Sequence, residues 1–195
     1  MYPLLFCSIV SLSVVIERML FWIREEMRRN QDLVDQVLRL CEKGRWEDVR
    51  QKVTDSKDYV IRVLVAGIVH REFSMSKAME AAATDEIKRM QRFMSVMDTM
   101  ITVAPLLGIF GTVLGIITSF ELLGASGIQH PEAVTAGIAQ ALITTATGLG
   151  IAILTVIPYN YFSSKVELAA ITIEKYATSL EIVHEKLNQP GEGKK

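Results

Sequence analysis

Hydroxyl and amide side chains lie inside two long apolar runs of this chain, residues 99–120 and 134–158, which contain no acidic or basic residue. A hydroxyl can pass a proton along a hydrogen-bonded chain that includes water, but it cannot hold a proton at neutral pH. Together these side chains could line a polar path through an apolar layer, and a titrating group would have to come from elsewhere. The residues that could line such a path are Thr112, Gln140, Thr144 and Thr145.

A simpler role is open for each threonine taken singly. In an apolar helix a threonine hydroxyl usually donates to the carbonyl four residues earlier, which makes it a packing residue of its own helix. Hydroxyls scattered around the helices would favour this role, and with it a membrane scaffold that does not conduct. Thr112 falls on one side of its run together with Gly108 and Ser119, which favours the polar path.

Small residues recur at spacings of three and four in the run 99–120. This pattern predicts a helix face that another helix can approach closely. A nucleotide-binding role for the glycines is excluded, because no phosphate-binding lysine follows them and no strand precedes them. The residues expected to pack the helices together are Pro105, Gly108, Gly111, Gly115 and Gly148.

The distribution of charge predicts an all-α membrane protein with three transmembrane helices. All 21 basic residues lie outside the segment from Thr99 to Ser164. An ion in the hydrocarbon core costs several kcal/mol, so uncharged apolar runs of about 20 residues are typical of spanning helices. The predicted spans are residues 1–23, 99–120 and 134–158. Because 22% of all residues are nevertheless charged, a substantial aqueous part is expected as well.

Lysine and arginine remain in cytoplasmic loops, and this rule orients the spans. It places the amino terminus outside, residues 24–98 inside as a helical domain, residues 121–133 outside as a short loop, and residues 159–187 inside as a helical extension. Residues 188–195 are expected to form a disordered tail. A cleaved signal peptide is the alternative for the first run, but its basic residues follow the apolar core instead of preceding it.

Apolar residues at helical spacing predict further helices in the charged parts of the chain. One covers Leu33–Cys41 with Gly44 as its stop, a short one covers Trp46–Val53, and another covers Tyr59–Phe73. The fold class is therefore a membrane bundle whose second and third transmembrane helices extend into a cytoplasmic helical bundle.

Two apolar stripes support these extensions. One runs from Met79 to Met97 without glycine or proline, so the second spanning helix should continue unbroken through it. The other runs from Val166 to Leu187. The uncharged window 133–164 exceeds the roughly 20 residues needed to cross, so the third span begins with a re-entry segment, extends past the membrane, or both.

The inventory of reactive residues argues against an enzyme. No acid is spaced with His70, His130 or His184 as a metal site or catalytic triad requires, and no metal or other cofactor is expected. The net charge of −1 gives no electrostatic case for binding nucleic acid. Cys7 and Cys41 are far apart and form no redox motif, so two free thiols are expected.

Three segments closely resemble the MotA/TolQ/ExbB proton-channel family in order, spacing and topology: Gly108–Phe120, Ala136–Gly150 and Ile157–Asn160. The adjacent residues Glu17 and Arg18 are similar to the family's Glu-Arg pair. Three spans in fewer than 200 residues resemble the ExbB/TolQ branch more than the four-span flagellar MotA branch.

The resemblance implies a multi-pass subunit of the bacterial inner membrane with a periplasmic amino terminus and a cytoplasmic carboxyl terminus. It implies a ring, typically a pentamer, around the single spans of two ExbD- or TolR-like partners, with a TonB- or TolA-like energy transducer as a further partner. Proton flow would drive work at the periplasm or outer membrane, such as TonB-dependent transport. Thr112 and Thr145 match the family's two pore-facing threonines, and Pro105 matches the proline that opens the motif of the second span.

Gln140 departs from the family pattern, because ExbB- and TolQ-like chains commonly have glutamate there. A role that depends on a carboxylate at this position does not carry over. The titrating carboxylate is then expected from a partner, and ExbD-like subunits carry one aspartate in their single span. The alternatives are a non-conducting membrane scaffold and a MotA-like stator of a flagellar or gliding motor.

Overall fold

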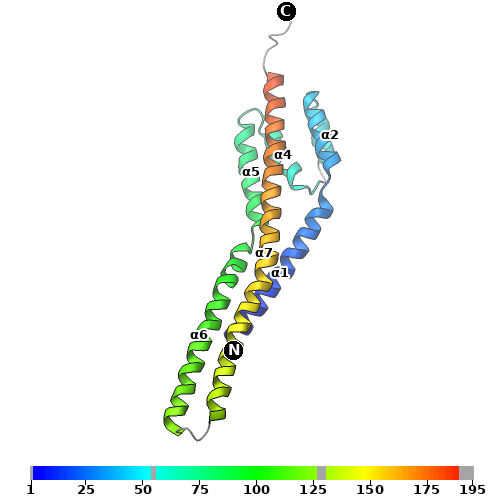
Figure 1. Ribbon diagram of the computed structural model, residues 1–195. Helices are drawn as coiled ribbons and strands as arrows, with labels where there is room; N and C mark the ends of the chain where they lie inside the picture. The colour runs from blue at the N-terminus through cyan, green and yellow to red at the C-terminus, as the bar shows by residue number, and fades with distance from the viewer. Residues whose placement is uncertain (1, 54–55, 127–130, 189–195) are drawn as a thin grey trace, which may run out of the picture. The chain divides into compact units, whose positions relative to one another are not determined.

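The computed structural model of the protein describes residues 2–53, 56–126 and 131–188, and within them every regular element is an α-helix. Figure 1 shows these helices in chain order, from blue to red. The predicted tail, apart from Asn188, and residues 127–130 of the predicted outer loop lie outside the described residues. The helices are α1 (Tyr2–Arg28), α2 (Gln31–Glu42), α3 (Trp46–Val53), α4 (Tyr59–Val69), α5 (Met75–Met90), α6 (Met94–Ser126) and α7 (Pro131–Asn188).

The helices form two compact units, each with its own internal contacts. The span unit consists of the described parts of Met1–Met19 and Phe93–Ser163, and thus of most of α1, all of α6 and the first half of α7. The charged unit consists of the described parts of Leu20–Arg92 and Ser164–Lys195, with α2 to α5 and the ends of α1 and α7.

Apolar side chains join the three helices of the span unit. Leu4 and Cys7 of α1 form a buried cluster with Ala104 of α6 and Ile151 of α7. The outward faces of the same helices are apolar and exposed, as at Leu154, which is 76% exposed. Apolar faces of this size are typical of surfaces that lipid or another protein covers.

Three helical stretches are long and apolar enough to cross a membrane, and they lie in α1, in α5–α6 and in α7. This confirms the predicted all-α membrane protein with three spanning helices. Helix α7 is continuous over 58 residues, far more than the roughly 20 that a crossing requires. Because α7 is one continuous helix from Pro131 onward, its described residues contain no separate re-entry segment.

The predicted unbroken second helix is wrong at one point. Residues 91–93 form a turn between α5 and α6, and Phe93 has a φ of +63°. That region is rarely adopted by bulky residues. The ring of Phe93 lies under the Arg18 guanidinium, 5.8 Å from its centre, and this cation–π contact favours the observed conformation.

The charged unit follows the predicted helices closely. Helix α3 has the predicted bounds, and α2 ends just before Gly44, whose φ of +68° suits glycine. Helix α4 is shorter than predicted, because it ends at Val69 and a turn follows. Its apolar face supplies much of the unit's core, with Val63 and Leu64 fully buried.

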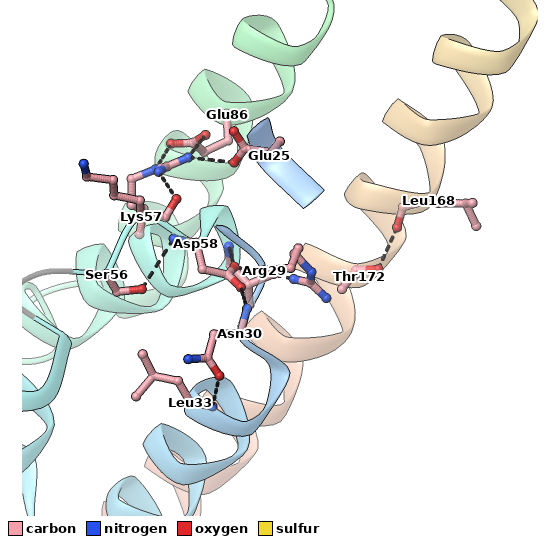
Figure 2. Close-up of polar contacts among 12 residues, drawn as sticks. Glu25, Arg29, Asn30, Leu33, Ser56, Lys57, Asp58, Glu86, Leu168 and Thr172 are labelled. Atoms are coloured by element: carbon pink, nitrogen blue, oxygen red, sulfur yellow. Dashed lines mark hydrogen bonds and ion pairs between the residues drawn. The ribbon is translucent and has the colours of Figure 1, made fainter. Parts of the chain in front are cut away.

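Asp58 fixes the start of α4 against the turn between α1 and α2 (Figure 2). Its carboxylate is fully buried and accepts from the backbone N–H of Val60 and of Asn30, both at 2.8 Å. It also pairs with the Arg29 guanidinium at 3.5 Å. A buried carboxylate is stable only with such partners, so this residue joins two helix ends that are distant in sequence.

A second set of charges joins α1, α4 and α5. Glu25 is 2% exposed and accepts from Arg89 at 3.1 Å and from Arg62 at 3.5 Å. Arg62 also donates to both oxygens of Glu86, at 2.6 and 2.8 Å. Burial opposes the charge of Arg62, but the hydrogen bonds and charges of Glu86 and Glu25 outweigh it and raise the pKa of Arg62 above its ordinary value.

Candidate proton pathway between α6 and α7

Three threonine hydroxyls and two backbone carbonyls meet where α6 and α7 lie side by side (Figure 1). The hydroxyls of Thr112 and Thr145 are hydrogen-bonded to each other. The carbonyl oxygen of Gly108 lies 3.1 Å from each of these hydroxyls and 3.2 Å from that of Thr144. The carbonyl oxygen of Ala141 lies 3.0 Å from the Thr112 hydroxyl and 2.7 Å from that of Thr144. We call these five groups the hydroxyl cluster.

The hydroxyl cluster has more hydrogen-bond acceptors than hydrogens to donate. More than one pattern of hydrogen bonds is therefore possible. Each hydroxyl donates one hydrogen and accepts up to two. Thr112 can donate to Ala141 and accept from Thr145, or Thr145 can donate to Gly108 and accept from Thr112. The direction of the hydrogen bonds can therefore reverse, as a relay requires, without any group in the cluster taking up charge.

Glycines bring the two backbones close enough for these bonds. A methyl group at Gly108 would lie 3.0 Å from the Thr144 carbonyl oxygen, and one at Gly111 would lie 2.7 Å from the Thr144 hydroxyl. One at Gly115 would lie 2.7 Å from the Ala141 methyl group. Small residues permit this approach, which gains dispersion contacts and polar bonds across the helix pair.

Gly148 of α7 and Pro105 of α6 lie in the same pair of helices, nearer to the start of α6. A methyl group at Gly148 would collide with the Ala104 carbonyl group. Pro105 lies inside α6 and is half-buried. Because proline has no N–H, it leaves the helix carbonyl four residues earlier without its usual partner.

Gln140 lies one helical turn before Thr144 on α7, and its side chain is exposed. The structure thus brings three of the four expected path residues together, while Gln140 faces outward one turn away.

A second hydroxyl pair was not among the expected path residues. Ser11 of α1 and Thr155 of α7 are buried and hydrogen-bonded to each other, and Thr155 also donates to the Ile151 carbonyl at 2.7 Å. A hollow of about 200 Å³ lies beside them, with Ser8 and Leu12 in its lining. The only signal in the sequence is the presence of hydroxyls in uncharged runs, which does not say which of them meet.

Arg18 is the one fully buried charge of the described span unit, at 1% exposure. It donates to both oxygens of Glu17, at 2.6 and 2.8 Å. This forked arrangement is the strongest geometry for an arginine–carboxylate pair. Among the described residues, no group of three or more histidine, cysteine or acidic side chains could hold a metal ion.

The helices of this site fall within a known sequence family. The profile of the MotA/TolQ/ExbB proton channel family matches residues 56–175, which include all of α6 and most of α7. The chain belongs to this family. Its relatives place it in the ExbB/TolQ branch, as the sequence resemblance predicted.

Three relatives illustrate the similarity. The biopolymer transport protein ExbB-like 3 of Synechocystis is 32% identical over 199 residues, which cover 98% of this chain and 93% of the relative. TolQ of the Tol-Pal system of Pseudomonas aeruginosa is 35% identical, over 58% of this chain and 50% of the relative. ExbB of Xanthomonas campestris, a biopolymer transport protein, is 33% identical, over 57% of this chain and 43% of the relative.

Together, the three apolar helices and the ExbB/TolQ relatives indicate a multi-pass bacterial inner-membrane protein of a proton-channel family that acts in biopolymer transport. The family is one of transport channel proteins.

Proposed function

We propose that this chain is the ring-forming subunit of a proton-driven motor in the bacterial inner membrane. In this proposal a ring of copies, a pentamer as in the family, surrounds the single spans of ExbD- or TolR-like partners. Proton flow past the hydroxyl cluster drives motion that a TonB- or TolA-like transducer passes to the periplasm or outer membrane. Residues 24–98 and 159–187 would be cytoplasmic, and residues 121–133 periplasmic.

The observation that carries this proposal is a polar cluster without a titratable group. Thr112, Thr144 and Thr145 meet at two carbonyls, whereas residues 99–120 and 134–164 contain no acid, lysine, arginine or histidine. Proton transfer across a membrane normally uses a carboxylate near the midplane. We therefore assign that carboxylate to the partner, with the hydroxyls placed to bond it or the water beside it.

A non-conducting scaffold is supported by one feature of the same cluster. Thr112 also bonds the carbonyl four residues earlier in its own helix, as Thr147 does at 2.7 Å with Ile143. Such a bond satisfies a hydroxyl locally and requires no path. The proton path and the non-conducting scaffold differ in one expected result: removing the hydroxyls should lower proton conduction only if they form a path.

The test is proton flux into vesicles that hold this chain and its single-span partner. Replacing Thr112 and Thr145 together by valine keeps their shape and removes both hydroxyls. At about 0.6 to 1.7 kcal/mol for each bond within a membrane, the double variant should conduct about tenfold more slowly or worse. The control is Thr147→Val, which removes an exposed hydroxyl of the same helix and should leave flux unchanged.

Assembly is measured on the same samples by native mass spectrometry. If both variants form the same oligomer, a loss of flux reports on the path and not on folding. Full flux in the double variant would contradict the proposed path and return both threonines to a packing role.

A further inference from the structure

Two unlike surfaces of the charged unit lie next to each other on α7. The first is a groove of about 360 Å³ between α5 and α7. Its lining includes alanines and glutamates, together with the buried side chains of Met79 and Ile173. We call it the acidic groove, and the residues that define it are Glu80, Ala83, Ala170, Glu174, Ala177 and Glu181.

The second surface is an exposed apolar stripe that also carries a basic residue. Leu168, Ile171 and Ile182 are 60%, 55% and 57% exposed. Lys175 lies between them and is exposed as well. These four residues, which we call the exposed stripe, are separated by three, four and seven positions, so they share one face of α7.

Lipid does not account for the exposed stripe. Residues 165–186 carry seven lysines and glutamates, and that density of charge is incompatible with the hydrocarbon core. An apolar face in an aqueous region instead indicates a surface that another protein covers.

The charges of the two surfaces are complementary, and the Lys175 ammonium also lies over the Tyr176 ring, 5.5 Å from its centre. Among the ion pairs of the described residues, none involves Glu80, Glu174, Glu181 or Lys175. Three alanines in the lining of the acidic groove, Ala83, Ala170 and Ala177, leave room for larger side chains of the exposed stripe.

The positions of the two surfaces suit a second copy of the same chain. Ile171, Lys175 and Ile182 each follow a groove residue by one position. The two surfaces are therefore about 100° apart around α7 and only about 1.5 Å apart along its axis. Copies inserted in one membrane in the same direction are related by rotation about the membrane normal, so each residue keeps its height from copy to copy.

We propose that the exposed stripe of one copy docks in the acidic groove of the next, with Lys175 facing Glu80 and Glu174. Because the two surfaces differ, the contact is heterologous, and rotation about one axis closes it into a ring. The proposal rests on the proposed ring-forming function and names the surface that forms the ring.

Cysteine cross-linking of the purified full-length chain tests the contact. The variant Ala170→Cys with Ile171→Cys places one thiol in the groove and one on the stripe, and these lie at neighbouring heights in adjacent copies. Oxidation should give a ladder of covalent oligomers on a non-reducing gel, up to the full ring. The single variant Ile171→Cys, and Ala170→Cys with Arg39→Cys on the exposed face of α2, should give no ladder.

Charge exchange tests the register independently. Glu80→Lys and Lys175→Glu should each lower the association constant of one contact by roughly two- to fivefold, as exposed ion pairs do, and the two changes together should restore it. Lys186→Glu makes the same change of charge on the same helix beyond the groove and should have no effect. The readout is the fraction of ring in native mass spectra at low salt.

The outcomes separate this inference from the proposed function. A ladder with restored assembly in the exchanged pair supports the docking. If a ring forms but gives no disulfide-linked oligomers, and neither charge variant changes the fraction of ring, the docking is overturned and the ring-forming function is left intact. An unsubstituted chain that is only a monomer overturns both.

Discussion

Replacing Gly148 by alanine should separate α6 from α7, because the added methyl group meets backbone and not a movable side chain. It would lie 3.2 Å from the Ala104 carbonyl carbon and 3.2 Å from the Gly108 Cα, with the Ala104 oxygen closer still. Ordinary contact begins near 3.4 Å, so the helices must part or one of them must bend. The cost is that of an overpacked interior, about 1–3 kcal/mol.

The matched control is Gly150→Ala, two residues further along α7. Apart from the adjoining backbone of α7 itself, no atom lies within 4 Å of a methyl group there. Alanine is up to about 1 kcal/mol better than glycine inside a helix. We therefore expect the control to be neutral or slightly stabilising, although the two variants change the sequence in the same way.

Thermal unfolding in detergent, followed by the loss of soluble protein on heating, measures the difference. For a chain of this size 1 kcal/mol corresponds to roughly 2–4 °C in Tm. Gly148→Ala should therefore lower Tm by about 2–12 °C, and Gly150→Ala should not lower it. Equal Tm values for the two variants would refute the reasoning that close approach of the helix backbones holds the hydroxyl cluster together.

Other predictions concern the charged unit and the orientation. Glu25→Gln removes a buried carboxylate that pairs with two arginines. It should lower the free energy of unfolding, measured by chemical denaturation, by about 1–3 kcal/mol. An unchanged value would contradict the role of Glu25 in joining the helices. Burial, together with the charge of a neighbouring acid, raises the pKa of the Cys41 thiol to about 12. The folded protein should therefore keep this thiol protonated and unalkylated at pH 9–10, whereas the unfolded chain reacts, and equal alkylation by peptide mass spectrometry would contradict this. A cysteine at Gly124 should react with an impermeant maleimide from the periplasmic side and one at Phe73 only from the cytoplasm, and the reverse pattern would overturn the orientation.

Much of the fold could be predicted because its signals are local. Uncharged apolar runs mark spanning helices wherever they occur, and three such helices are observed. Helix α3 could be bounded from the spacing of its apolar residues, since Val49 and Val53 share one buried face. These features depend on neighbours within a turn or two of the helix.

The break before α6 could not be predicted, because its cause is distant in sequence. No glycine or proline marks it, and Phe93 contacts Arg18 on another helix. The candidate site shows the same limit. The spacing of small residues and hydroxyls indicated a helix pair with polar groups, but the pairing of Thr112 with Thr145 depends on the register between α6 and α7. The pairing of Ser11 with Thr155 depends likewise on how α1 meets α7.

The most direct test of the proposed function is proton flux in vesicles that hold this chain alone or together with an ExbD-like protein as the proposed partner. We expect the chain alone to conduct no more than empty vesicles, because the hydroxyl cluster contains no group that can hold a proton. Addition of the partner should start the flux, and replacing the aspartate of the partner's span by asparagine should stop it. Equal flux with and without the partner would contradict the claim that the titrating group is supplied by the partner.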